Sequence, residues 1–152
     1  MKFEIEYTGV AEDRQLIYRA EEHSFDTEPV ENDINFDIVL NKLNLTTIDD
    51  NKVVQVWGGC GLTAWMKSNC EVPKSRKGVL KVVDDLEIGV GSYRVNREEL
   101  PVHVNIQTGW VCIGNPVKLG NTVEFINNCI AVIDDDNEFV ALWLKPQSLP
   151  QL

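Results

Sequence analysis

The sequence predicts a mainly β protein, a single-domain antiparallel β-sandwich or barrel of about nine to eleven short strands with little helix. Three observations predict it. Apolar and polar residues alternate with a period of two along much of the chain. Clusters of Gly, Asn, Asp and Pro recur between these runs, and helical periodicity is almost absent. The 152 residues, 43% of them apolar, suffice for one packed core, so we expect one β-rich domain over residues 1–152.

The first third of the chain contains both strand and loop signals. Phe3, Ile5 and Tyr7 alternate with charged residues, which predicts a half-buried strand. Residues 16–20 are expected to return as its hairpin partner, although residues 11–22 would equally suit a short helix. Residues 21–33 hold six acids, which indicates an exposed acidic loop.

The remaining strands follow from alternation or from short apolar runs. The glycine-rich residues 58–61 are expected to end one of them, residues 62–66 to form a helical turn or a short strand, and residues 74–78 to be a basic connection. The expected strands cover residues 34–38, 53–57, 79–83, 92–95, 102–106, 110–113, 123–126, 129–133 and 139–144, and Leu43 and Leu45 lead to a turn at residues 49–51.

The formal net charge is −10, from 24 acidic and 14 basic side chains. Nucleic acids and anionic membranes are bound through Lys and Arg, so we expect neither as a partner. The acidity is uneven: residues 1–50 carry 13 acids and 4 bases, whereas residues 51–100 carry 6 acids and 8 bases. This asymmetry predicts one anionic face that binds a basic partner.

The compartment is inferred from signals that the sequence lacks. The first residues alternate apolar with charged side chains and form no continuous apolar run, so no signal peptide is expected. We expect a cytoplasmic protein whose four cysteines are buried thiols rather than disulfides: Cys60, Cys70, Cys112 and Cys129.

Cys60 is the one candidate nucleophile. It lies among glycines, and His103 could serve as its base in a cysteine-dependent hydrolase. The favoured interpretation is a glycine-rich bend with a small buried thiol, because the residues that follow are too few to predict an activating helix. A second alternative is a ligand-binding β-barrel, which would require that the tryptophans leave the interior open.

Metal and cofactor motifs are not convincing. The cysteines show no C-x-x-C spacing. Residues 134–138 resemble a calcium loop but lack its glycine and its final glutamate, so a solvated hairpin turn is expected. The glycines at 89 and 91 lack the third glycine of a dinucleotide fingerprint. We therefore expect no metal, no cofactor and no enzymatic activity.

The candidate partner-binding residues are mainly acidic. Trp65 joins them because it adjoins Met66 and Lys67, whereas Trp57, Trp110 and Trp143 lie among aliphatic residues and are expected in the core. The full candidate set is Glu21, Glu22, Asp26, Glu28, Glu31, Asp33, Trp65, Asp134, Asp135 and Asp136.

The small, acidic, β-rich profile and the acidic segment 21–33 resemble the immunity proteins of bacterial polymorphic-toxin systems, with those of contact-dependent growth inhibition the nearest comparison. The resemblance implies a cognate toxin domain as partner, often a basic nuclease. It also implies inhibition by masking the active cleft or a neighbouring site. A phage-encoded inhibitor of a host protein would obey the same physics.

Overall fold

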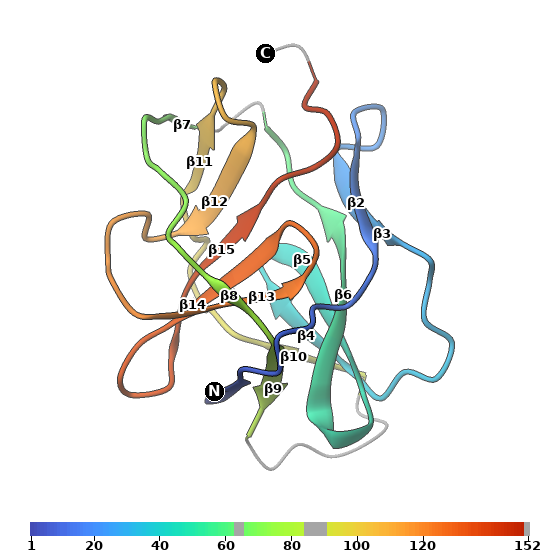
Figure 1. The fold of residues 1–152 in the computed structure, drawn as a ribbon. Helices are drawn as coiled ribbons and strands as arrows, with labels where there is room; N and C mark the ends of the chain where they lie inside the picture. The colour runs from blue at the N-terminus through green and yellow to red at the C-terminus, as the bar shows by residue number, and fades with distance from the viewer. Residues whose placement is uncertain (63–65, 84–90, 151–152) are drawn as a thin grey trace.

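The computed structural model describes residues 1–62, 66–83 and 91–150. These residues form two β-sheets around a shared core, and their only helical element is the 3-10 turn η1 (Asp49–Asn51) (Figure 1). The predicted fold class, a mainly β sandwich or barrel, is confirmed.

Sheet A contains eight strands, and its neighbouring pairs are antiparallel except that β10 runs parallel to β4. The hairpin β2–β3 joins the sheet through β6. In spatial order the strands are β1 (Phe3–Glu6), β9 (Val79–Val82), β6 (Lys52–Gly59), β5 (Lys42–Ile48), β4 (Asp37–Leu40) and β10 (Ser92–Arg94), with β2 (Gln15–Arg19) and β3 (Ser24–Glu28) beside β6.

Sheet B contains seven strands and has a two-residue strand at each edge, β7 and β8, each parallel to its neighbour. In spatial order the strands are β7 (Met66–Lys67), β11 (Val102–Asn105), β12 (Trp110–Gly114), β15 (Phe139–Leu144), β14 (Cys129–Ile133), β13 (Asn121–Ile126) and β8 (Arg76–Lys77).

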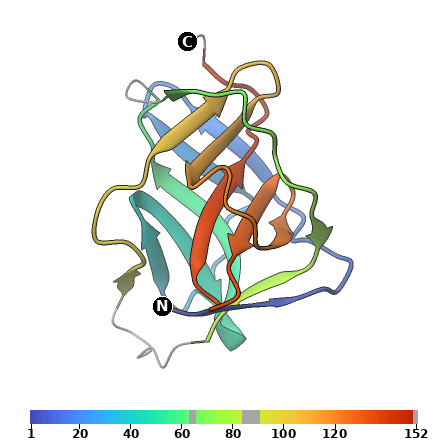
Figure 2. The same cartoon turned by 90° about the vertical axis from the view of Figure 1, so that its left-hand side faces the viewer.

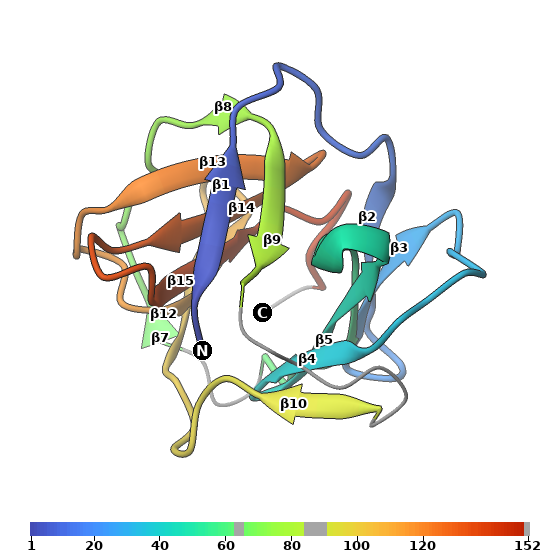
Figure 3. The same ribbon diagram turned by 90° about the horizontal axis from the view of Figure 1, so that it is seen from below.

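The chain passes from sheet B to sheet A at Gly78, between β8 and β9. A Cβ atom there would lie 2.2 Å from the carbonyl oxygen of Glu6, so only glycine allows this approach to β1. Seen from below, β1 and β9 lie between β13 of sheet B and β5 of sheet A (Figure 3). The inner faces of both sheets meet in one core whose large members include Phe3, Phe25, Phe36 and Phe125.

Sheet B is buried on its outer face as well. Cys112, Ile130 and Trp143 belong to a second apolar cluster on that face, against which Cys70 and Val72 pack. The covering segment, residues 68–74, is attached near both ends: the amide of Ser68 donates to Val104, and the Thr122 hydroxyl donates to Lys74. Figure 2 shows this green segment crossing over the sheet.

Two predictions about the first third of the chain are wrong. The first strand pairs with β9, not with residues 16–20, because β2 pairs with the following strand β3. That strand lies inside segment 21–33, which is therefore not wholly a loop. Its residues Phe25 and Thr27 alternate inward and are buried.

The glycine-rich segment 58–61 ends β6, as predicted, but its first two residues also take part in strand pairing. Strand β6 continues through Gly59, and β3 joins it at Gly58 and Gly59. Gly58 has a positive φ of 125°, and a Cβ atom there would lie 2.6 Å from the carbonyl oxygen of Lys42. The glycines therefore let three strands approach closely, and β6 ends directly after them. With β3, β7 and β8, the described residues contain 15 strands, more than the nine to eleven expected.

Candidate functional site

Four candidate acids lie on or near the hairpin β2–β3. Asp26 and Glu28 project from its outer side, where both pair with Arg19 at 3.4 and 2.9 Å. Glu21 and Glu22 lie in the exposed turn between the strands. Two of the four acids are thus partly neutralised, which the sequence alone did not indicate.

The loop after β3 is fixed to the body of the protein by Arg14. Its side chain is buried, donates to the carbonyl oxygen of Pro29 and pairs with Glu31 at 3.0 Å. Glu12 lies 3.8 Å from Arg14 and 2.7 Å from Lys52, which extends the network to β6. A buried arginine therefore holds the acidic loop against sheet A.

Glu31 has a structural role in this loop. Its carboxylate accepts hydrogen bonds from the backbone amides of Asp33 and Asn32, at 3.4 and 3.1 Å. These amides, and then Arg14, hold the pKa of Glu31 below its ordinary value. Of the candidate acids in segment 21–33, only Glu21, Glu22 and Asp33 form no ion pair with a described residue.

Two buried polar side chains bridge β3 and β6 where their ladder ends. The Thr27 hydroxyl donates to the carbonyl oxygen of Val56 and accepts from its amide. Gln55 donates to the carbonyl oxygen of Thr27 and accepts from the amide of Glu31. The acidic loop is therefore preordered by hydrogen bonds that water cannot easily replace.

The acidic turn 134–138 lies elsewhere. In Figure 1 it is at the lower left, whereas β2 and β3 are on the right. Asp134 accepts from the amides of Glu138 and Asp136, both at 2.9 Å, and these bonds together with Lys118 lower its pKa. Asp135 and Asp136 are exposed. The predicted acids therefore do not form one continuous anionic face.

The tryptophans also differ from expectation. Trp143 is buried as predicted and Trp110 is half-buried, but the prediction of a core position for Trp57 is wrong, because 41% of its surface is exposed. Trp57 lies on the outer face of sheet A, beside the acidic hairpin. Trp65 lies outside the described residues.

The outer face of sheet A is defined by ladder partners, which project to the same side. One row joins Asp37 to Thr46 and Gln55, and the next joins Val39 to Asn44 and Trp57. Because Ser24 pairs with Gly59, the alternate residues of β3 share this side. The outer face of sheet A therefore comprises acidic, basic, polar and apolar residues: Gln15, Ile17, Arg19, Ser24, Asp26, Glu28, Asp37, Val39, Lys42, Asn44, Thr46, Gln55, Trp57, Gly59, Ser92 and Arg94.

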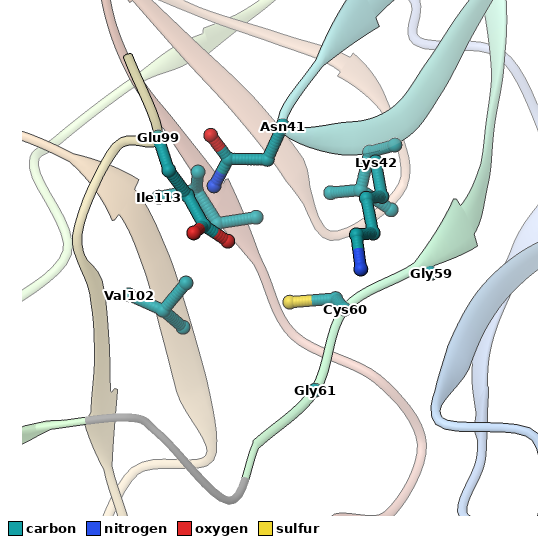
Figure 4. Close-up of a pocket in the computed structure, with 9 residues that line it drawn as sticks. Asn41, Lys42, Gly59, Cys60, Gly61, Glu99, Val102 and Ile113 are labelled. Atoms are coloured by element: carbon teal, nitrogen blue, oxygen red, sulfur yellow. The ribbon is translucent and has the colours of Figure 1, made fainter.

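Cys60 lines a cavity of about 170 Å³ with Lys42, Glu99 and Val102 (Figure 4). Burial, and then the nearby charge of Glu99, raises the pKa of its thiol to about 12. A thiol with this pKa is protonated at neutral pH and is a poor nucleophile. His103, on β11, is not among the residues that line the cavity. The geometry does not favour a Cys60–His103 hydrolase.

Nor does it favour an open ligand-binding barrel. Side chains from both sheets fill the space between them, with Phe25, Phe36 and Phe125 each at most 2% exposed. Within the described part of the chain, no group of three or more His, Cys, Asp or Glu side chains could hold a metal ion. None of its helical structure has the length and hydropathy that a membrane crossing requires.

No protein-family model matches the chain, and no curated protein resembles it significantly.

Proposed function

We propose that the protein is a cytoplasmic immunity protein that binds and neutralises a basic toxin domain, most simply a nuclease, by masking its active cleft or an adjacent site. The observation that carries this proposal is the preordered acidic segment beside the open face of sheet A. From residue 12 to residue 37 the chain carries nine acids and two bases, a formal charge of −7.

Charge of this density accelerates association with a cationic partner. Complementary electrostatic fields raise association rate constants to about 10⁸ M⁻¹s⁻¹ or more at low salt. Three of the acids in this stretch, Glu21, Glu22 and Asp33, are exposed and form no ion pair with a described residue, so their charge is available to a partner.

Preordering supports the same proposal. Arg14, Gln55 and Thr27 fix the loop in the free protein, so binding does not incur the entropy cost of ordering it. Ile34 and Val30 are exposed within the loop, at 53% and 64%, and supply apolar contact beside the acids. Tight inhibitors combine apolar anchors with complementary charge in this way.

The test co-expresses this chain with the product of the adjacent reading frame. We expect that product alone to arrest growth, the pair to grow normally, and the two proteins to form a 1:1 complex in light scattering. Growth that this chain does not restore, together with the absence of a complex, would contradict the proposal.

A matched pair of variants tests the role of charge in that complex. Glu21→Lys/Glu22→Lys and Asp135→Lys/Asp136→Lys both reverse two adjacent exposed acids, but on opposite sides of the molecule. We expect the first variant to slow association by about tenfold at low salt and to flatten the salt dependence, and the second to change little. Equal effects would indicate that only net charge matters.

A further inference from the structure

We propose that Trp57, Thr46 and Asp37 form a receptor for an arginine side chain of the partner, an inference that rests on the proposed function. The three residues come from the adjacent strands β6, β5 and β4 and lie on the outer face of sheet A.

A single hydroxyl group fixes the relative positions of the ring and the carboxylate. The indole Nε1–H of Trp57 donates to Thr46 Oγ1 at 2.8 Å, and Thr46 Oγ1 donates to Asp37 Oδ1 at 2.5 Å. Thr46 is only 2% exposed, so both bonds are largely shielded from water. The indole and the carboxylate are therefore held side by side on rigid strands before any partner arrives.

Both groups retain free binding capacity. Trp57 is 41% exposed although its ring nitrogen is already satisfied, so its exposed surface is ring rather than polar edge. Among the described residues, no donor bonds the second carboxylate oxygen of Asp37. Asp26 lies beside Trp57, because it follows Phe25, whose ladder partner Gly58 adjoins Trp57. Its pairing with Arg19 at 3.4 Å leaves Asp37 as the main anionic group of the receptor.

This arrangement fits a guanidinium group. Arginine stacks its planar head on an indole face and directs its N–H groups at a carboxylate, whereas lysine offers a compact ammonium that does neither as well. A tryptophan anchor in the middle of a polar face is also typical of binding hot spots. The apolar loop on the opposite side, where Leu119 is 88% exposed, has Lys118 and Lys74 beside it and would repel a cation.

The first experiment needs no natural partner. The indole ¹H–¹⁵N resonance of Trp57 is assigned with Trp57→Phe and followed during titration with an arginine–glycine repeat peptide, then with its lysine counterpart. We expect the Trp57 resonance to shift at least about threefold more with the arginine peptide, and the sealed Trp143 resonance not to move. Equal shifts for both peptides, or none at Trp57, would overturn the inference.

Asp37→Asn tests whether the carboxylate charge contributes to peptide binding in this titration. It keeps an oxygen that accepts from Thr46 but removes the charge, so the arginine peptide should bind about three- to tenfold more weakly while the resonance of Trp57 stays close to its wild-type position. Unchanged arginine binding by this variant would remove Asp37 from the receptor.

The second experiment uses the cognate toxin domain from the co-expression test. Trp57→Ala should weaken the complex by about 30-fold or more, whereas Leu119→Ala, a truncation of an even more exposed apolar side chain, should leave it unchanged. Unchanged affinity of Trp57→Ala, in a complex that still forms, would overturn the receptor but not the immunity function. Absence of a complex with the wild-type chain would instead contradict the immunity function, and the peptide titration would still decide the receptor.

Discussion

The outer faces of the two sheets differ in whether another segment of the chain covers them. Each carries a tryptophan on an inner strand, Trp143 on β15 and Trp57 on β6. Trp143 is 2% exposed because segment 68–74 covers it, whereas Trp57 is 41% exposed and no described segment covers it. The chain thus seals the outer face of sheet B with its own backbone and leaves the outer face of sheet A open around Trp57.

The surroundings of the two rings explain the difference. Trp143 lies among Ile130, Val132 and Ala141, an apolar surface that gains free energy when it is covered. Trp57 lies among Asn44, Thr46 and Asp37, which interact well with water or with a polar partner. The sealed face therefore serves stability, and the open face is suited to recognition.

The largest expected effect comes from the sealed face. Trp143→Ala should lower the free energy of unfolding by about 3 to 5 kcal/mol, because it leaves a cavity beneath segment 68–74. Urea denaturation followed by circular dichroism measures this loss. A loss below about 1 kcal/mol would show that the segment does not pack as described.

Arg14→Met should have the next largest effect, about 2 kcal/mol, since it leaves Glu31 and Glu12 without their buried cation. Hydrogen exchange should then accelerate at Glu31, Asn32 and Asp33, while segment 68–74 keeps its protection. Uniform acceleration across both sheets would instead mean that Arg14 supports the whole fold and not the acidic loop in particular.

Cys112 predicts a pH dependence of stability on the sealed face. Burial, and then Cys70, raises the pKa of its thiol to about 12, above the ordinary value of 9.0. The unfolded chain loses this proton first as pH rises, so stability is full below about pH 8.5 and is lost progressively up to about pH 12. Between pH 7 and pH 10 this thiol should lower the free energy of unfolding by about 1 to 2 kcal/mol. In Cys112→Ala, the free energy of unfolding should therefore fall less steeply with pH over this range. An unchanged slope would contradict burial of the thiol.

The smallest effect on stability is expected at the open face. Trp57→Ala should lower the free energy of unfolding by about 1 to 2 kcal/mol, less than Trp143→Ala, since 41% of the Trp57 surface is already exposed in the native state. Side-by-side denaturation of this variant and Trp143→Ala measures the contrast directly. Similar losses for the two variants would remove the distinction between the faces.

The alternating strands were predictable because burial of one face imposes a period of two. Val102 and Val104 of β11 illustrate this, whereas β14 is buried on both faces and is a continuous apolar run. The partners of β1 and β2 were not predictable, because alternation defines which face is buried but not which strand lies alongside. Segment 21–33 was misread as a loop because its acids on the open side masked the inward alternation of Phe25 and Thr27.

The candidate site was predictable only in part. The acidic composition of segment 21–33 is evident in the sequence, but the ion pairs of Arg14 and Arg19 that partly neutralise it depend on tertiary contacts. Trp57 was assigned to the core because it follows the buried run from Val53 to Val56. The sequence did contain a signal: Trp57 lies two residues after the polar Gln55, so in a strand both side chains point to the same face, away from the core.

The most direct test of the central claim, that the outer face of sheet A binds the partner, is amide hydrogen exchange in the complex with the cognate toxin domain. We expect added protection across residues 24–37 and in β5 and β6, with segment 68–74 and the loop at 115–120 unchanged. Protection confined to residues 68–74 and 115–120, with none at 24–37, would contradict it.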